Sequence, residues 1–205
     1  GKSLLFVTRK GQVKRTELKE YATNRSSGIV ACKVGEQAAL MTVLQSSGAQ
    51  DLLLVSKLGM AIRFKEDEVN PMGRAAGGVR GIALGEDDEV VAAELLAGDE
   101  GEIVVVSDAG YAKRSLVSDY PVQGRGGKGL RTFEIKEGKR VKPNGSGLVG
   151  AYAVKEPFDL TAVLSTGEKT VFSTEHTPIE ELKSTGKQVS ALAKADKIVS
   201  LIKIT

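Results

Sequence analysis

The sequence contains little of several residue types that many functions need. It has no Trp, and only 4% of its 205 residues are aromatic. It contains one Cys, Cys32, and one His, His176. A single Cys cannot form an internal disulfide, which fits a reducing, cytosolic compartment. The sequence shows no signal peptide and no run of about 18 apolar residues, so we expect neither secretion nor membrane spanning.

The same scarcity argues against a catalytic centre. His176 lies in a polar stretch, and Cys32 lies on an apolar alternation that predicts a core position. A nucleophile–base pair or a zinc site needs partners that neither residue has nearby in the sequence. The acidic run Glu86–Glu89 could hold a cation, but a charged hairpin turn explains it better. We therefore expect no turnover, no cofactor and no metal.

Glycine, by contrast, is abundant, at 24 residues. Four segments repeat one pattern at intervals of roughly 50 residues: an apolar strand, a turn glycine and a second short strand that is often basic. The turn glycines are Gly11, Gly59, Gly110 and Gly167. A second glycine follows each at nearly constant spacing, at Gly28, Gly78, Gly129 and Gly186. Two glycines in register four times indicate an array of four β modules.

Each repeat has room for four strands. In the first, Leu4–Thr8 and Gln12–Thr16 flank a turn at Gly11 and predict a hairpin. Ile29–Val34 predicts a third strand and Ala38–Gln45 a fourth, joined by a turn at Gly35 and Glu36. Four strands per repeat are typical of a propeller-like array. The third strands of the later repeats are predicted at Val79–Leu84, Leu130–Lys136 and Lys187–Ala193.

Contiguous repeats favour a single domain over residues 1–205, with repeats at about 1–50, 51–101, 102–159 and 160–205. The third repeat contains an insert, Glu137 to Gly147, whose composition predicts an exposed, mobile and basic loop. Helix is expected to be limited to one turn at Pro178–Leu182. Because aromatic residues are scarce, we expect Val, Leu, Ile and Ala to fill narrow interfaces between small sheets.

The net charge is only +3, but the charges are unevenly distributed. Basic residues collect in the second strand of a repeat and before its second glycine, whereas acidic residues collect in the turn between its last two strands. Repeated modules place equivalent positions at the same height and radius, so the basic sets are expected to form a band. Such a band suits a phosphate backbone, and a solvated surface of mixed charge is the alternative.

The sharpest local motif is Gln123–Gly129, which reads Gln-Gly-Arg-Gly-Gly-Lys-Gly. Its glycines let the backbone approach a ligand, Arg125 and Lys128 supply two cations, and the bared N–H groups can form an anion-binding nest. The motif also matches the dinucleotide pattern G-x-G-x-x-G, but a strand-like segment follows it instead of a helix. A P-loop needs Gly-Lys-Ser/Thr, and here Gly129 follows Lys128. Neither nucleotide site is predicted.

The motif resembles the Gln-Arg-Arg-Gly-Gly-Lys-Gly box in the carboxy-terminal domain of the DNA gyrase A protein, differing at Gly124. The resemblance extends along the chain through Gly11–Tyr21, Ala61–Ile82 and Gly110–Tyr120, with the corresponding protein of topoisomerase IV as the nearest relative. It implies an all-β fold, the β-pinwheel, whose propeller-like four-stranded blades exchange strands between neighbours. It also implies a non-catalytic role in bending duplex DNA around a basic perimeter, with the DNA-cleaving tyrosine in another domain of an ATP-dependent topoisomerase.

The chain departs from the family pattern in its repeat number and in the place of the box. The family domain usually has six blades with the box in the first, whereas here the box-like sequence lies in the third of four repeats. We therefore interpret the chain as the last four blades, with Gln123–Gly129 as a secondary, degenerate copy of the box. The sequence leaves open whether four blades close into a ring or form an open crescent.

Charge pattern and resemblance together predict a sequence-nonspecific interface with duplex DNA. The side chains expected to contact it are Lys14, Arg15, Arg25, Arg63, Arg74, Arg80, Lys113, Arg114, Gln123, Arg125, Lys128 and Arg131. The expected partners are duplex DNA, the remainder of the gyrase A protein and, through it, the ATPase protein of gyrase, in the cytoplasm and away from membranes. The alternative function is a propeller-like protein-interaction scaffold that binds no DNA.

Overall fold

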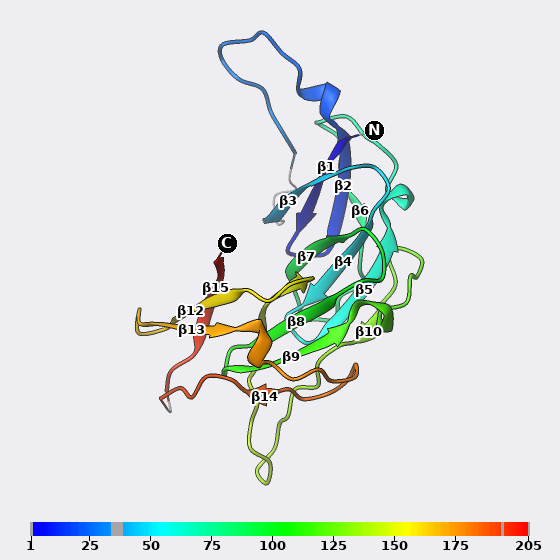
Figure 1. Cartoon of the computed structure of the whole chain (residues 1–205). Coiled ribbons are helices and arrows are strands. Elements are labelled where there is room, and N and C mark those ends of the chain that lie inside the picture. Colours follow the sequence, from blue (N-terminus) through cyan, green and yellow to red (C-terminus); the bar gives the residue numbers. More distant parts are fainter. Residues whose placement is uncertain (1, 34–38, 194, 205) are drawn as a thin grey trace.

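Fifteen short strands in four small antiparallel sheets make up the described part of the chain (Figure 1). The computed structural model describes residues 2–33, 39–193 and 195–204. The first sheet has the order β3-β1-β2-β6 and contains β1 (Ser3–Thr8), β2 (Gln12–Glu17), β3 (Leu40–Ser46) and β6 (Val79–Arg80). The second has the order β10-β5-β4-β7 and contains β4 (Asp51–Ser56), β5 (Met60–Lys65), β7 (Val90–Leu96) and β10 (Leu130–Arg131).

The remaining two sheets follow the same plan. The third has the order β11-β8-β9-β14 and contains β8 (Glu102–Ser107), β9 (Tyr111–Leu116), β11 (Leu148–Val154) and β14 (Lys187–Gln188). The fourth has the order β13-β12-β15 and contains β12 (Asp159–Leu164), β13 (Lys169–Ser173) and β15 (Ile198–Ile204). Short 3₁₀ turns follow the second strand of each repeat: η1 (Leu18–Tyr21), η2 (Glu66–Glu68), η3 (Val117–Asp119) and η4 (Thr174–His176).

Neighbouring repeats exchange strands, as the resemblance implied. The outer short strands β6, β10 and β14 each belong to the repeat that follows the rest of their sheet. β6 pairs with β2, β10 with β5, and β14 with β9. Each of these three blades is therefore completed by a segment of the next repeat, and the all-β, four-bladed prediction is confirmed.

The predicted hairpins are confirmed in all four repeats. Each turns at its glycine, with φ values of 85°, 91°, 80° and 89° at Gly11, Gly59, Gly110 and Gly167. A Cβ atom in this left-handed region costs roughly 1–2 kcal/mol, which explains why glycine stands at each turn.

The predicted third strands were too long. Only Val79–Arg80, Leu130–Arg131 and Lys187–Gln188 form ladder pairs. The partner strands begin immediately after a turn glycine, so the ladder cannot continue, and the segment instead bends over that turn. In the first repeat, residues 29–33 form no strand, and Val34 and the turn at Gly35 and Glu36 lie outside the described residues. The fourth strand begins at Leu40 and runs to Ser46, whereas Ala38 also lies outside them.

The structure also corrects three smaller predictions. Pro178–Leu182 is not helical, because Ile179 bridges Arg114, and the turn of 3₁₀ helix lies just before it at Thr174–His176. Cys32, which was predicted at a core position, is half-buried in a segment without secondary structure and belongs to none of the core clusters. In the insert, residues 137–143 are exposed as predicted, but Asn144 and Gly147 are buried and hold its far end.

The core consists of three apolar clusters, one between each pair of adjacent blades. They are rich in Val, Leu, Ile and Ala, as the composition indicated. The inner strands pack in the order β3, β7, β11 and β15, and the described blades form an open crescent and not a closed ring (Figure 1). The exchanged strands lie on its outer side, which brings the glycine-rich segments to the perimeter.

Candidate nucleic-acid interface

We call the segments that cross from one blade to the next straps. Strap 1 covers residues 21–33, strap 2 residues 71–84, strap 3 residues 122–135 and strap 4 residues 179–192. Straps 2 to 4 begin with the same bond, in which a strap N–H donates to an arginine carbonyl of the preceding blade at 2.8 Å. The pairs are Met72 and Arg15, Gln123 and Arg63, and Glu180 and Arg114.

The second glycine of the second, third and fourth repeats explains how straps 2 to 4 lie so close to the preceding blade. A Cβ at Gly78 would be 2.9 Å from the Val13 carbonyl oxygen, and one at Gly186 would be 3.0 Å from that of Ala112. At Gly129, with φ of 74°, it would press directly on the Ala61 carbonyl. The second glycine therefore marks the point where each of these straps crosses the preceding blade.

The box-like segment of strap 3 lies against strap 2. The Arg125 guanidinium donates from Nη1 to the Arg80 carbonyl at 2.6 Å and from Nε to the Glu68 carbonyl at 3.3 Å. Gly126 N donates to the Gly81 carbonyl at 2.9 Å, and Arg125 N donates to Glu68 Oε1 at 3.0 Å. The predicted anion nest is wrong for these two N–H groups, because the protein itself binds them.

The straps form a continuous row around the outer side of the crescent. Arg74 Nη1 of strap 2 donates to the Val30 carbonyl of strap 1 at 2.7 Å. Ala83 N of strap 2 donates to the Gly127 carbonyl of strap 3 at 2.8 Å, and Glu134 N of strap 3 donates to the Ser184 carbonyl of strap 4 at 2.9 Å. The basic side chains of different repeats are therefore held on one surface.

Three of the sequence-predicted cations are buried. Lys14 bonds to the Arg74 carbonyl, and Lys113 Nζ donates to the Glu181 carbonyl at 2.7 Å. Burial lowers the pKa of Lys113 to about 8, against the opposing effect of Glu180 and Asp119. Arg63, only 3% exposed, forms ion pairs with Asp51 at 2.9 Å and Asp99 at 2.8 Å. These three side chains join blades to straps and point into the protein interior.

Two further predicted cations are partly covered. Arg114 pairs with Glu102 at 2.9 Å and donates to Thr177 Oγ1 at 3.0 Å. Arg15 is half-buried, and its Nε is buried with no hydrogen-bond partner among the described residues. Arg15, Arg63 and Arg114 occupy one repeat position in the second strand, where the next strap covers them.

The remaining candidates lie on the straps with solvent access. Arg25, Arg80 and Lys128 are exposed, and Arg74, Gln123, Arg125 and Arg131 are half-buried. Arg131 also pairs with Glu134 at 3.3 Å. The structure thus places the strap cations of repeats two and three on one solvent-accessible surface. The cations of the second strands are buried or partly covered.

Sequence reasoning missed other exposed cations on the same side. Lys187 lies on β14, at the strap position next to the one that Arg80 and Arg131 occupy. The insert exposes Lys139, Arg140 and Lys142 beside strap 4, where Lys142 Nζ reaches Gln188 Oε1 at 3.4 Å. The repeat alignment carried the signal for Lys187, and the basic composition carried it for the insert.

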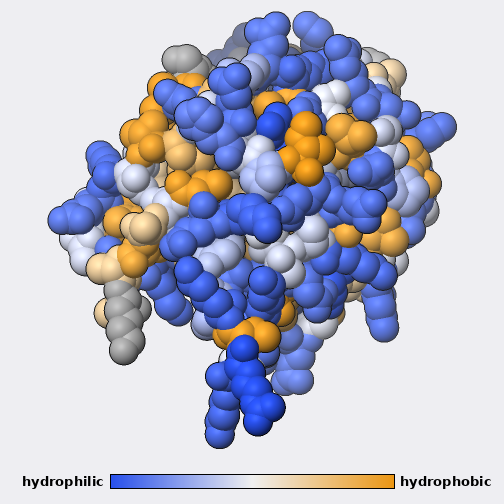
Figure 2. Space-filling model, turned by 60° about the horizontal axis from the view of Figure 1, so that its bottom comes forward, coloured by the Kyte–Doolittle hydropathy of each residue, from blue (hydrophilic) through white to orange (hydrophobic). Residues whose placement is uncertain are grey.

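The insert is anchored by Asn144, which is fully buried. Its side chain accepts from Lys136 N at 2.7 Å and donates to the Glu134 and Thr185 carbonyls, each at 2.9 Å. One side chain therefore ties the insert to both strap 3 and strap 4. Figure 2 shows the lower end of the molecule, where hydrophilic residues predominate and hydrophobic ones form separate small patches.

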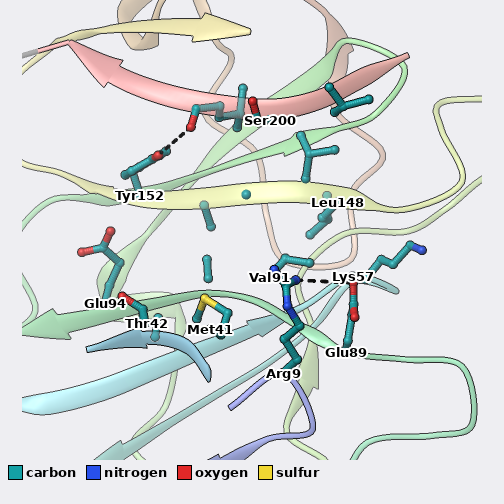
Figure 3. A pocket seen from close by; sticks show the side chains of 17 residues that line it. Arg9, Met41, Thr42, Lys57, Glu89, Val91, Glu94, Leu148, Tyr152 and Ser200 are labelled. Carbon is teal, nitrogen blue, oxygen red and sulfur yellow. Dashed lines mark hydrogen bonds and ion pairs between the residues drawn. The ribbon is translucent and has the colours of Figure 1, made fainter. Parts of the chain in front are cut away.

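A groove of about 460 Å³ lies on the inner side, between β3, β7, β11 and β15 (Figure 3). Arg9 and Glu89 form a long ion pair of 3.9 Å at one end, and Tyr152 donates to the Leu201 carbonyl at 3.4 Å at the other. Glu94 lies in its wall, and burial raises the pKa of its carboxyl to about 7. Mixed charges line this groove, in contrast to straps 1 and 2, which contain no acidic residue.

Two kinds of feature are absent from the described residues. No group of three or more His, Cys, Asp or Glu side chains in residues 2–33, 39–193 and 195–204 is arranged to hold a metal ion. Within the same ranges, no helix has the length and apolar character needed to cross a membrane.

Comparison with protein families gives one match over most of the chain. The family model described as the DNA gyrase C-terminal domain, beta-propeller, matches residues 2–47, 50–97 and 101–154. The DNA gyrase A protein of Mycolicibacterium smegmatis is 36% identical over 205 residues, which cover 97% of this chain and 23% of that protein. Its counterpart in Mycobacterium tuberculosis is 39% identical over 169 residues, covering 80% of this chain and 19% of that protein. The chain thus spans less than a quarter of these relatives.

Solved structures share the fold. The C-terminal domain of DNA topoisomerase IV superimposes with a TM-score of 0.89 at 24% identity, covering 99% of this chain and 62% of that one. The DNA gyrase A C-terminal domain gives a TM-score of 0.82 at 24% identity, covering 100% of this chain and 66% of that one. The blades and their exchanged strands are therefore those of a β-pinwheel.

Proposed function

This chain belongs to the DNA gyrase C-terminal domain family, and from that membership we propose that it binds and bends duplex DNA along the outer row of straps. The observation that carries the proposal is the continuity of the straps, which places the cations of separate repeats on one curved surface. Phosphates recur regularly along DNA, so a row of cations on a rigid arc matches the backbone without reading bases.

The phosphate contacts are assigned to the exposed strap cations. Arg80 and Lys128 have no ion-pair partner among the described residues, and Arg25, Arg74, Arg125 and Arg131 lie on the same row. Lys14, Arg63 and Lys113 are left out, because their burial commits them to the blade junctions. The exposed cations of the insert extend the row beyond strap 3.

Bending sets a requirement on the number of phosphates that are bound. Curving 20–30 base pairs costs roughly 1–6 kcal/mol, which only several simultaneous phosphate interactions offset. We propose that the four repeats act as one unit for this reason. We also propose that the chain performs no chemistry itself and serves a gyrase-type topoisomerase in the cytoplasm, joined to the rest of the gyrase A protein and through it to the ATPase protein.

Ligation of a nicked circular plasmid tests the wrapping. Increasing amounts of the chain are added at low and physiological salt, the nick is sealed, and the topoisomers are separated. We expect a shift in linking number of one sign that fades as salt rises. Binding to short duplex without any shift would show that these blades hold DNA without bending it.

Removing the charges of two exposed strap cations tests whether duplex DNA binds along the straps. The double variant Arg80→Ala/Lys128→Ala should weaken binding to all duplex sequences and reduce the slope of log affinity against log salt by about 0.9 for each phosphate that is no longer neutralised. Lys155→Ala/Lys197→Ala is the matched control, because it removes the same charge from exposed sites outside the straps. Equal affinity loss in both variants would reject the strap surface, and no duplex binding by the wild type would favour the scaffold function.

A further inference from the structure

The insert of the third repeat is a projecting loop, whereas the equivalent segments of two other repeats are short. Straps 2 to 4 each cross a turn glycine and donate an N–H to its carbonyl at 3.3 Å; the donors are Ile82, Phe133 and Ser190. The next inner strand begins at Val90, eight residues after Ile82, but at Leu148, fifteen residues after Phe133. Figure 1 shows the longer loop, in yellow-green, extending beyond the blades at the bottom of the view.

The base of this loop is fixed to the protein. The Asn144 side chain ties it to straps 3 and 4, and the Asn144 carbonyl accepts from Ser107 Oγ at 2.6 Å. Ser146 N donates to Asp108 Oδ1 at 2.9 Å. Ser107 ends β8 and Asp108 follows it in the hairpin turn, so two further groups of the third blade hold the loop. It therefore leaves the surface in a set direction.

The tip of the loop is a turn with two cations at its apex. Lys139 and Arg140 lie between Gly138 and Val141, and all four residues are exposed. A Cβ at Gly138 would be 3.8 Å from Val141 Cγ2, so the two sides of the loop meet there. The Val141 side chain is 47% exposed. In the part of the chain that the structure describes, neither Lys139 nor Arg140 forms an ion pair.

The insert also reverses the charge of its counterpart in the second repeat. That counterpart is the acidic run Glu86–Glu89, which contains no cation. The insert has one acidic residue, Glu137, and three exposed cations, which are Lys139, Arg140 and Lys142. A polyanion that follows the straps is therefore repelled at the short turn of the second repeat and attracted at the insert.

A duplex that bends around the straps presents a groove that the tip of the insert can reach. The minor groove narrows where bent DNA turns it toward the protein, and narrowing strengthens the negative potential that attracts Arg and Lys. Strap cations lie on the blades and meet phosphates, whereas the tip projects past them. The minor groove is only about 6 Å wide, so side chains of the tip can enter it but two adjacent lengths of backbone cannot.

We propose that Lys139 and Arg140 insert into the minor groove of the bound duplex and make the chain prefer A·T-rich DNA at that point, which rests on the proposed DNA binding. Minor-groove edges of A·T pairs carry only acceptors, whereas a G·C pair adds the guanine N2 amino donor. Two cationic donors therefore suit A·T pairs and are opposed by G·C pairs. The insert thus adds a preference in base composition to phosphate contacts that read no bases.

Equilibrium binding to three duplexes of about 16 base pairs, too short to wrap, tests the preference. Their centres contain A·T pairs, G·C pairs or inosine·C pairs. Inosine lacks the N2 amino group, so an inosine·C pair combines the minor groove of A·T with the major groove of G·C. The wild type should bind the A·T and inosine duplexes about threefold more tightly than the G·C duplex, or more. Equal binding to all three would overturn the proposal, and so would an inosine duplex that binds like G·C.

Substitution at the tip separates groove insertion from phosphate contact. Arg140→Ala, at an exposed position, should remove most of the preference by weakening A·T and inosine binding alone. Arg80→Ala, on strap 2, should weaken binding to all three duplexes by one factor. Lys155→Ala, exposed and outside the straps, is the matched control and should keep the wild-type preference. If Arg140→Ala lowers all three affinities equally, Arg140 contacts only phosphate and the proposal is wrong.

Netropsin, which occupies the minor groove of A·T tracts, supplies a second readout. It should lower the wild-type affinity for the A·T duplex to that of Arg140→Ala and leave the variant's affinity unchanged. An equal effect on both proteins would overturn the groove contact. A wild type that binds all three duplexes equally loses this proposal and keeps the proposed DNA binding, whereas a wild type that binds none loses both.

Discussion

Arg63 shows how one side chain can resemble a ligand-binding cation and serve the fold instead. It donates to Asp51 and Asp99 and to the carbonyls of Gly98, Val117 and Tyr120. These groups come from two blades, so the guanidinium fastens one to the next. Removing a buried charge with this many partners strongly destabilises a fold, because Asp51, which is 18% exposed, and the Val117 and Tyr120 carbonyls then lose the cation that pairs them.

Arg63→Ala should therefore lower the free energy of unfolding by about 3–5 kcal/mol. Urea denaturation followed by circular dichroism measures the change. Arg80→Ala, at an exposed position, should stay within about 0.5 kcal/mol of the wild type. A stable Arg63→Ala chain that had lost only DNA affinity would contradict the structural assignment and return Arg63 to the interface.

Glu94 makes stability depend on pH. Burial raises its pKa from 4.5 to about 7, although the Ala153 backbone and Lys203 oppose the shift. The folded chain holds this proton more tightly than the unfolded chain. The stabilisation that comes from binding this proton is therefore fully present below about pH 4.5 and is lost as the pH rises through about 7.

Glu94→Gln, a neutral isostere, should remove this dependence. Relative to the wild type, the variant should become more stable by up to about 3 kcal/mol between pH 4.5 and pH 8. Urea denaturation of both proteins across this range isolates the one group from all other titrations. A difference that stays constant with pH would show that Glu94 titrates normally.

At the scale of elements, the junction between a strap and a strand depends on glycine at the point of contact. Gly129 combines a φ of 74° with a Cβ position that falls on the Ala61 carbonyl. Gly127, two residues earlier, has no such constraint, because its Cβ would come no closer than 4.0 Å, to Ile62 Cδ1. The two glycines look alike in the sequence and differ in what lies against them.

Gly129→Ala should destabilise the chain by about 2–5 kcal/mol, the sum of a strained left-handed residue and an overpacked contact. Gly127→Ala should change stability by less than about 0.5 kcal/mol. Thermal and urea denaturation compare the two. Equal effects would show that the strap shifts to accept a side chain, against the close packing described for this junction.

At the scale of the whole molecule, the blades are linked only to their neighbours, so stability should vary along the crescent. The apolar residues of β4 and β8 are 0–1% exposed, and each strand lies between two others in its sheet. Strap 1 and the outer edge of β13 are covered on fewer sides. Local opening should therefore be easiest at the two ends.

Hydrogen–deuterium exchange measured by mass spectrometry tests this gradient. Peptides covering β4 and β8 should exchange slowest, and those covering strap 1 and β13 fastest. Uniform protection along the chain would show instead that the four blades unfold only as one cooperative unit.

The sequence by itself determined the repeat, the hairpins and the fold class. Gly11, Gly59, Gly110 and Gly167 each have a positive φ, and the apolar strand before each glycine pairs with the strand that follows it. Such features depend on residues that are close in the sequence, and they recur in all four repeats, so the sequence pattern predicts them. The resemblance in Gln123–Gly129 supplied the exchange of strands between blades.

Only the tertiary structure decided which of the predicted cations remain exposed to solvent. Lys14, Arg63 and Lys113 are buried and Arg80 and Lys128 exposed because each strap folds over the second strand of the preceding blade, and that cover comes from residues about 60 positions away. The same long-range packing shortened the predicted third strands and used the N–H groups of Arg125 and Gly126. Burial by a distant segment leaves no periodic trace in the residues it covers, so no reading of local pattern could find it.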